Sequence, residues 1–344
     1  MIIFSILAVI FVFFLLIFPH ELGHFISAKS CGMQVNRFSI GMGPKLWGFK
    51  RKETEYVISP LLLGGYVKIA GMAPGEENLE KGFRRQSWGK RVLVLISGSL
   101  MNYLVAIIMF SLIFMIGFYT FNLEEAVIGE VSPGSPAERA NLLAGDKILK
   151  IDGHQVRKWE ELAQSIRNTQ SETLSLEVKR KDKVFIAQVK PVFDPELGRR
   201  IIGIIPSKVF RRYNPIISLT MGVERTVILT GLILSAVGGM VMGKVPAQLS
   251  GPVGIAQFVG ESAKLGLIPL FSLTALLSIN LALFNLFPIP ALDGGRLLFL
   301  LIEKIRGKAL KLEREEAIHY IGFIILITLF LLITYQDILR LIPK

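Results

Sequence analysis

The chain cannot cross-link itself covalently, because it contains a single cysteine, Cys31, among 344 residues. One cysteine can neither close an intrachain disulfide nor supply a cysteine-cluster zinc site. Charge is also scarce: 19% of the residues are Asp, Glu, Lys or Arg, whereas 51% are hydrophobic. A soluble protein needs more polar surface than this composition provides. The composition therefore excludes a disulfide scaffold and argues against a soluble single-domain enzyme.

Four long segments contain no charged side chain, and each is long enough to cross most of a bilayer. They run Met1–Pro19, Val92–Leu123, from Leu265 to the residue before Asp293, and Ala317–Tyr335. A cleaved signal peptide is the alternative for the first. That segment lacks a basic start and a small-residue cleavage site, and the polar His20 follows it at once. We therefore expect four transmembrane helices.

The segment 124–208 has a mixed, charged composition with turn-forming Pro and Gly residues. Alternation over Thr173–Lys179 and Val184–Lys190 predicts strands, and Trp159–Arg167 has helical spacing. We expect a soluble α+β domain in the order strand, turn, short helix, strand, then a helix and paired strands.

The excess of basic residues, 39 Lys and Arg against 27 Asp and Glu, determines the expected topology. Twelve lie in Lys29–Arg91 and six in Arg296–Arg314, and the positive-inside rule assigns both segments to the cytoplasm. Four spans satisfy this rule with both termini and the soluble domain outside. A fifth span over the uncharged Thr226–Gly243 would move Arg296–Arg314 outside, so we expect that segment to lie on the membrane or to pack against the other helices. Because topology accounts for the charge, we predict no nucleic-acid partner.

The sequence His20-Glu21-Leu22-Gly23-His24 fits the H-E-x-x-H pattern at the end of the first apolar segment. On a helix, the i, i+4 spacing places both imidazoles on one face, where they can bind one zinc ion. Glu21 lies next to that face and can take a proton from a zinc-bound water. The alternative is a polar helix end that meets the headgroups. Ionisable groups at this depth are costly, which favours a functional site.

A catalytic zinc site usually has three protein ligands and an open position for water. Asp293 is the only acid between Ser262 and Ile302, and it follows a segment that Pro288 and Pro290 interrupt. Irregular backbone at membrane depth is tolerated only where protein or a polar cavity surrounds it. Asp293 is therefore our candidate third ligand, with a turn or helix-cap role as the alternative. We expect His319 to be interfacial and His154 to be exposed in a turn of the soluble domain.

Several motifs together resemble the bacterial site-2 proteases, in particular the RseP-like, PDZ-containing branch. They are the His20–His24 motif, Gly64-Gly65-Tyr66-Val67, Ser250–Ile255, Asn285–Gly294, and two stretches similar to a PDZ core, Val127–Val131 and Ala144–Gly153. The resemblance implies an intramembrane zinc metalloendopeptidase of the bacterial cytoplasmic (inner) membrane, with Zn2+ as cofactor. It implies His20, His24 and Asp293 as zinc ligands and Glu21 as the catalytic base. It also implies substrate-binding roles for Asn285, Pro288, Pro290, Gly64, Gly65, Tyr66 and Val67.

Two features depart from the family pattern. Ser97-Gly98-Ser99-Leu100-Met101-Asn102 stands where relatives commonly have Gly-Pro before an Asn, so the resemblance does not fix the start of the second helix. The chain also has room for one PDZ-like module where some relatives carry two.

A peptide bond inside a transmembrane helix must be unwound before hydrolysis, and its freed backbone groups then need new partners. Glu55–Ile69 has the pattern of a β-hairpin-like stretch, with Gly64-Gly65 as its bend or bulge. A strand edge there could bind the unwound substrate by strand addition. The alternative is an ordinary cytoplasmic loop.

We therefore expect a polytopic α-helical membrane protein with four transmembrane helices, a membrane-associated β-hairpin loop and one extracytoplasmic PDZ-like α+β domain. The expected function is regulated cleavage of single-span membrane proteins, which the resemblance suggests are anti-sigma factors and remnant signal peptides after a first cleavage. The alternatives are a non-catalytic PDZ-containing membrane scaffold, with peptide or ectodomain contacts at that domain, and a transporter, which would call for internal repeats that we do not find. The expected boundaries are 1–28, 91–123, 265–296 and 317–340 for the transmembrane segments. The other expected segments are a cytoplasmic and membrane-embedded β-loop region at 29–90, the PDZ-like domain at 124–208, membrane-associated linker helices at 209–264, and a cytoplasmic loop at 297–316.

Overall fold

The computed structural model describes residues 2–73, 75–76, 79–244 and 251–341. The chain divides into two compact units, Met1–Ile116 with Tyr213–Lys344, and Gly117–Arg212. Ser250, which opens one of the family-like motifs, lies outside the described residues.

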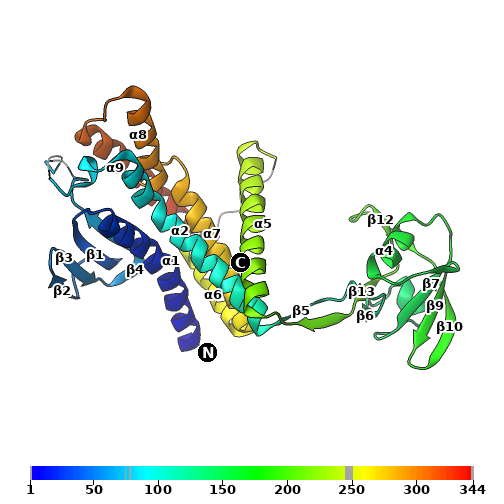
Figure 1. Cartoon of the computed structure of the whole chain (residues 1–344). Coiled ribbons are helices and arrows are strands. Elements are labelled where there is room, and N and C mark those ends of the chain that lie inside the picture. The colour runs from blue at the N-terminus through cyan, green and yellow to red at the C-terminus, as the bar shows by residue number, and fades with distance from the viewer. Residues whose placement is uncertain (1, 74, 77–78, 245–250, 342–344) are drawn as a thin grey trace. The chain divides into compact units, whose positions relative to one another are not determined.

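The first unit is helical. Its helices are α1 (Ile2–Ser30), α2 (Trp88–Ile116), α5 (Pro215–Val241), α6 (Pro252–Leu265), α7 (Leu267–Leu286), α8 (Asp293–Arg306) and α9 (Leu312–Leu341), with a short 3-10 helix at Phe83–Arg85 (Figure 1). Helix α2 packs against α1, α5 and α7. Five described helices, α1, α2, α5, α7 and α9, are long and apolar enough to cross a membrane. The protein is thus a polytopic α-helical membrane protein.

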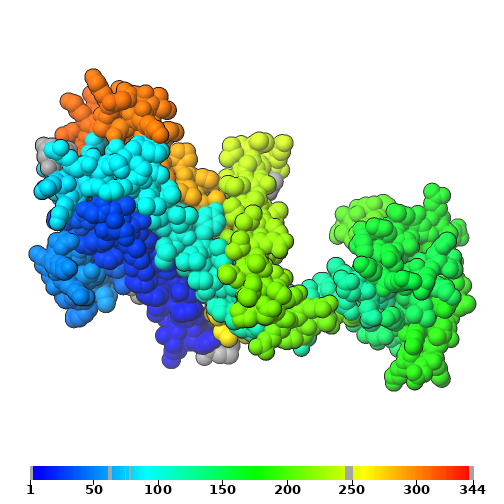
Figure 2. Space-filling view, in the orientation of Figure 1, coloured from blue at the N-terminus to red at the C-terminus, as the bar shows by residue number. Residues whose placement is uncertain are grey.

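Helix α5 changes the expectation for Thr226–Gly243. Most of that segment belongs to one continuous helix of 27 residues that begins at Pro215 and lies along α2 (Figure 2). Contact between the two helices is close, because a Cβ at Gly222 would lie 2.4 Å from Ser111 Oγ. This contact precedes Thr226–Gly243, whose residues after Thr226 are half-buried or exposed. The whole helix is long and apolar enough to span a membrane, so α5 is a fifth candidate span.

Three expected boundaries are corrected. The second apolar segment does not stay helical to residue 123: α2 ends at Ile116, and Gly117 has a φ of +97°, which favours glycine and turns the chain into a strand. The segment 297–316 is not a plain loop, because α8 continues to Arg306 and ends at Gly307 in the left-handed conformation. The helix α9 begins at Leu312, five residues before the expected start.

A four-stranded sheet follows α1, with strands β1 (Val35–Met42), β2 (Trp47–Arg51), β3 (Thr54–Ile58) and β4 (Leu61–Ile69) in the order β2-β3-β1-β4. The β-hairpin prediction for Glu55–Ile69 is wrong, because β3 and β4 do not pair with each other. Instead β1 lies between them, parallel to β3 and antiparallel to β4. Gly65 lies within β4 opposite Ile40, next to an irregularity in the register. Strand β4 is an edge strand.

The second unit contains twelve named elements. They are β5 (Phe118–Phe121), β6 (Ile128–Val131), α3 (Pro136–Arg139), β7 (Lys147–Ile151), β8 (His154–Gln155), α4 (Trp159–Asn168), β9 (Leu174–Arg180), β10 (Lys183–Val189), β11 (Val192–Asp194), β12 (Arg199–Ile201), β13 (Ile204–Pro206) and β14 (Lys208–Arg211). Its main sheet has the order β10-β9-β7-β8. From β6 to β10 the elements follow the expected order, and a core that includes Ile148, Leu162 and Leu176 fills the space between them.

Candidate metal centre and active site

The two histidines of the H-E-x-x-H motif lie on one face of α1, as their spacing predicts. Both are 8% exposed, and their ring centroids are 4.8 Å apart. The two Nε2 atoms face each other at 3.2 Å. In neutral imidazoles these atoms can both offer lone pairs to one ion.

Asp293 completes the cluster from the first residue of α8. Its Oδ2 lies 3.3 Å from His20 Nε2 and 3.1 Å from His24 Nε2, and it has no hydrogen-bond partner among the described residues. Zinc bonds of about 2.0–2.1 Å in tetrahedral geometry separate ligand atoms by roughly 3.3 Å. The three distances and the unpaired buried oxygen therefore fit a single zinc ion.

Backbone contacts hold Asp293 at this position. A Cβ at Gly294 would lie 2.0 Å from the Phe287 carbonyl oxygen, and a Cβ at Gly295 would lie 2.5 Å from the Ile289 carbonyl oxygen. Two glycines therefore allow the loop after α7 to fold tightly over the start of α8. Pro290 packs against Gly322 of α9, where a Cβ would lie 2.5 Å from Pro290 Cβ.

Helix α2 forms the wall behind the histidines. His24 Nδ1 lies 2.8 Å from the Val94 carbonyl oxygen, to which it can donate a hydrogen bond. That bond leaves Nε2 unprotonated for a metal. One turn further along α2, Gly98 touches both rings: a Cβ there would lie 2.3 Å from His24 Nε2 and 2.7 Å from His20 Cε1.

Most of the predicted site residues line one cavity of about 280 Å³. Its lining comprises His20, Glu21, His24, Gly65, Tyr66, Val67, Ile69, Met72, Leu95, Asn285, Ala291, Leu292, Asp293 and Arg296. Gly65 of β4 covers the candidate base, because a Cβ there would lie 2.9 Å from Glu21 Cγ. The structure thus brings the metal cluster, the glutamate, a strand and an asparagine together.

Three predicted substrate-binding residues lie outside this lining. Gly64 faces the Met42 side chain, Pro288 is exposed, and Pro290 contacts α9. These residues shape β4 and the loop before Asp293, and no cavity-facing contact is found for them.

Tyr66 is tied to the polar face of the sheet. Arg37 donates to the Tyr66 hydroxyl at 3.2 Å and to Glu55 Oε2 at 2.9 Å, and Lys45 donates to Glu55 Oε1 at 2.7 Å. The hydrogen bonds from Lys45 and then Arg37 lower the pKa of the Glu55 carboxyl. This network links β4 to β1 and β3 beside the cavity.

His319 contacts the loop that leads to Asp293, while its interfacial position stays a prediction. It is only half-exposed, and its Nδ1 accepts a hydrogen bond of 2.8 Å from the Ala291 amide. Ala291 has a φ of +79°, an unusual conformation for a residue with a Cβ, so this bond stabilises the loop that leads to Asp293. His154 is exposed in β8, as predicted.

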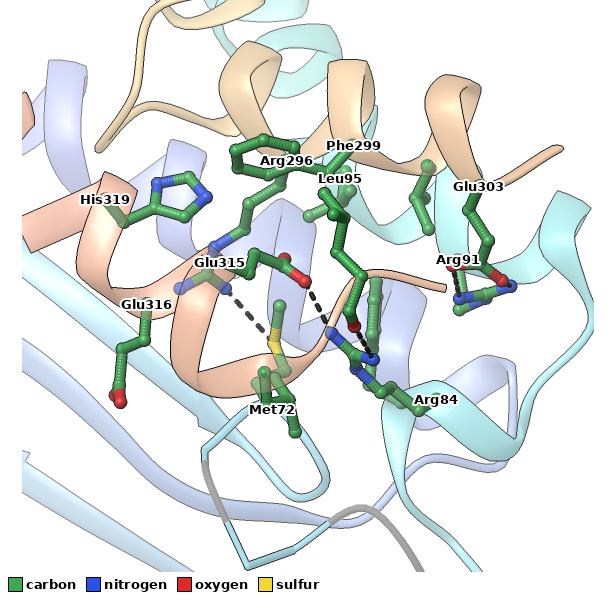
Figure 3. A pocket seen from close by; sticks show the side chains of 14 residues that line it. Met72, Arg84, Arg91, Leu95, Arg296, Phe299, Glu303, Glu315, Glu316 and His319 are labelled. Carbon is green, nitrogen blue, oxygen red and sulfur yellow. Dashed lines mark hydrogen bonds and ion pairs between the residues drawn. The ribbon is translucent and has the colours of Figure 1, made fainter. Parts of the chain in front are cut away.

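Figure 3 shows a second, smaller cavity of about 60 Å³ beside this loop. Two arginines there have acidic partners. Arg91 of α2 donates from Nη1 and Nη2 to the two carboxylate oxygens of Glu303 of α8, at 2.9 and 2.6 Å, and Arg84 donates to Glu315 of α9. Arg296 borders both cavities and donates to Met72 Sδ at 3.3 Å. These ion pairs hold α8 against α2, and α9 against the 3-10 helix at Phe83–Arg85, near the metal ligands.

The sequence did not indicate that Gly98, Asn102, Arg296 and His319 contact the site or the loop beside it. A buried asparagine in an apolar helix is a readable signal for Asn102. The contacts of the other residues depend on which helices become neighbours, and no local pattern reveals that.

Comparisons with known proteins agree with this geometry. Residues 8–329 match the family model described as Peptidase family M50. The chain is 31% identical to zinc metalloprotease RasP of Geobacillus kaustophilus, over 97% of each chain. It is 30% identical to the regulator of sigma-W protease RasP of Bacillus subtilis, over 98% of this chain and 99% of the relative. A solved PDZ domain of an SdrC-like protein from Listeria monocytogenes aligns with 25% of this chain and 92% of its own length, at 27% identity and a TM-score of 0.22, a score too low to support an argument.

Proposed function

This chain belongs to peptidase family M50 and is a zinc metalloprotease, and we propose that it cleaves single-span membrane proteins within the bilayer. One observation carries the proposal: a zinc-compatible cluster of His20, His24 and Asp293 shares a cavity with Glu21 among helices long enough to cross a membrane.

The chemistry follows from the residues around the cavity. Zinc, when bound, polarises the scissile carbonyl and acidifies a water molecule. Glu21 accepts the proton of the attacking water and returns it to the leaving amine nitrogen. The histidine rings keep fixed orientations, because α2 packs directly against them.

We propose that β4 holds the unwound substrate beside Glu21. Strand β4 is an edge strand, and Gly65, Tyr66 and Val67 line the cavity. An extended substrate segment can add to such an edge through backbone hydrogen bonds. Asn285, at the last turn of α7, faces the same cavity and is proposed to hold the substrate near the metal. Gly64, Pro288 and Pro290 are proposed to support this site by shaping the strand and the loop.

We propose that both basic segments face the cytoplasm and that the termini and the second unit lie outside. A fifth span at α5 would by itself move every later segment to the other side of the membrane. Helix α6, however, follows α5 and runs in the opposite direction. Helix α5 runs antiparallel to α2, since Gly222 lies against Ser111. Helix α6 runs antiparallel to α1, since Gly260 lies near Ser5. Together α5 and α6 return the chain to its starting side, so Arg296–Arg314 stays inside with either span count.

The physiological substrates are proposed to be anti-sigma factors and remnant signal peptides that a first protease has trimmed. A relative named regulator of sigma-W protease supports this class. We propose that the second unit is a PDZ-like domain that contacts peptide ends or ectodomains outside the bacterial cytoplasmic membrane, because its elements follow the expected order.

The test compares Glu21→Gln with Glu53→Gln in purified protein reconstituted with a single-span substrate. Glu53 is an exposed partner of Lys29, so its substitution controls for loss of a carboxylate. We expect Glu21→Gln to lower the cleavage rate by about 10²–10⁴-fold with its zinc content intact, and Glu53→Gln to cleave as the wild type does. Equal cleavage by wild type and Glu21→Gln would refute the proposal, and absence of cleavage and zinc in the wild type would favour a PDZ scaffold.

A further inference from the structure

Asn102 is a polar side chain in the apolar interior of α2. It is fully buried, and its backbone carbonyl accepts a hydrogen bond of 2.8 Å from the Ser278 hydroxyl of α7. Its side chain faces the metal cluster, with Nδ2 3.5 Å from His20 Nδ1. Its Oδ1 is buried without a partner among the described residues. A buried amide oxygen without a donor is destabilising, so such a group needs an explanation.

The orientation of this amide matters for His20. If Nδ1 of His20 accepted a hydrogen bond from the Asn102 amide group, the neutral ring would carry its hydrogen on Nε2. Nε2 is the atom that faces His24 and Asp293, and a protonated Nε2 has no lone pair for a metal. His24 has no such conflict, because the Val94 carbonyl can only accept and so places the hydrogen of His24 on Nδ1.

We propose that Asn102 is a positioning residue for the metal site, with its amide turned so that Oδ1 accepts a hydrogen bond from His20 Nδ1. The inference rests on the proposed zinc function. Rotation of the amide by 180° exchanges two atoms of nearly equal size and needs no backbone movement. The buried oxygen then gains a donor, and His20 Nε2 is free to bind zinc.

The wall of α2 supports this assignment. Val94, Gly98 and Asn102 are spaced four residues apart and lie on one face of the helix. Val94 contacts His24, Gly98 touches both rings, and Asn102 reaches His20. One helix face therefore supplies a hydrogen-bond acceptor to the second nitrogen of each histidine, an arrangement typical of zinc-binding histidines.

The test measures the zinc dissociation constant of full-length protein by competition with a chelator. Asn102→Leu and the smaller Asn102→Ala remove the acceptor, and we expect zinc binding to weaken by about 10–100-fold in both. Asn102→Asp keeps an acceptor oxygen, and we expect it to bind zinc at least as tightly as the wild type. Ser99→Ala is the matched control, because Ser99 is also fully buried on α2 and its hydroxyl has no partner among the described residues; its zinc binding should not change.

A second measurement separates positioning from folding. Cobalt replaces zinc in the purified variants, and its visible absorption reports the ligand geometry. We expect the Ala and Leu spectra to change and the Asp and Ser99→Ala spectra to match the wild type. Wild-type zinc affinity in both Ala and Leu, or an Asp variant as weak as Ala, would overturn the inference. A wild-type protein that binds no zinc would instead refute the proposed function.

Discussion

Gly98→Ala should weaken zinc binding strongly although Gly98 is not a ligand. The added Cβ would lie 2.3 Å from His24 Nε2 and 2.7 Å from His20 Cε1. Non-bonded atoms approach to about 3.5 Å, so one ring or the helix must move by roughly 1 Å. Helix α2 has little freedom to withdraw from α1, because α5 and α7 also pack against it.

The size of the expected loss of zinc affinity follows from how small a displacement a metal ligand tolerates. Metal sites tolerate ligand displacements of about 0.2 Å, several times less than the required shift. Changes beside a ligand that leave the ligand in place typically weaken metal binding by about 10–100-fold. We therefore expect Gly98→Ala to weaken zinc binding at least about 100-fold, which corresponds to about 2.7 kcal/mol.

The assay combines zinc content after purification, chelator competition and cleavage of a reconstituted single-span substrate. Gly89→Ala is the control: Gly89 lies in the first turn of α2, and a Cβ there meets no atom within 4 Å. Alanine there should favour the helix by about 1 kcal/mol and leave zinc unchanged. Wild-type zinc affinity and activity in Gly98→Ala would refute the packing of α2 against the metal site.

Three further predictions follow from the site and the proposed topology. Asp293→Ala should lose zinc binding and cleavage activity together, and the loss should exceed the roughly 10–100-fold typical of changes outside the ligands. Metal analysis and a cleavage assay measure the two losses. Full zinc content and full activity in this variant would mean that another residue is the third ligand. Proline at alternate positions of β4 should lower the cleavage rate more than alanine at the same positions, without loss of zinc. This loss of rate should be smaller for substrates with helix-breaking residues near the cut. A proline scan that leaves the cleavage rate unchanged would remove strand addition from the mechanism. In a background without Cys31, an external thiol reagent should label a cysteine at position 196 and not one at position 308; labelling of position 308 would contradict the proposed topology.

Most of the metal site could be predicted, because residue type and local spacing identify its ligands without knowledge of the tertiary contacts. The His20 and His24 pair follows from helical spacing alone. Asp293 follows from the scarcity of acids near an interrupted apolar segment, although it lies far from the histidines in sequence. The structure brings the three together at 3.1–3.3 Å.

The remaining features depend on long-range packing. The β-hairpin-like pattern over Glu55–Ile69 indicated extended chain, but only the strand pairing shows that β1 separates β3 from β4. Helix α6 has only 14 residues, so its apolar segment is shorter than a typical span, and its packing against α1 is visible only in the structure. The hydrogen bond from Ala291 to His319 joins the loop before α8 to helix α9, and no local sequence pattern connects these two segments.

The most direct test of intramembrane proteolysis is the position of the cut. Mass spectrometry of both products from a single-span substrate in liposomes locates the hydrolysed peptide bond. The account predicts a bond within the apolar segment of the substrate, cut by the wild type but not by Glu21→Gln or by chelator-treated enzyme. A bond outside the apolar segment, or the same products from Glu21→Gln, would contradict it.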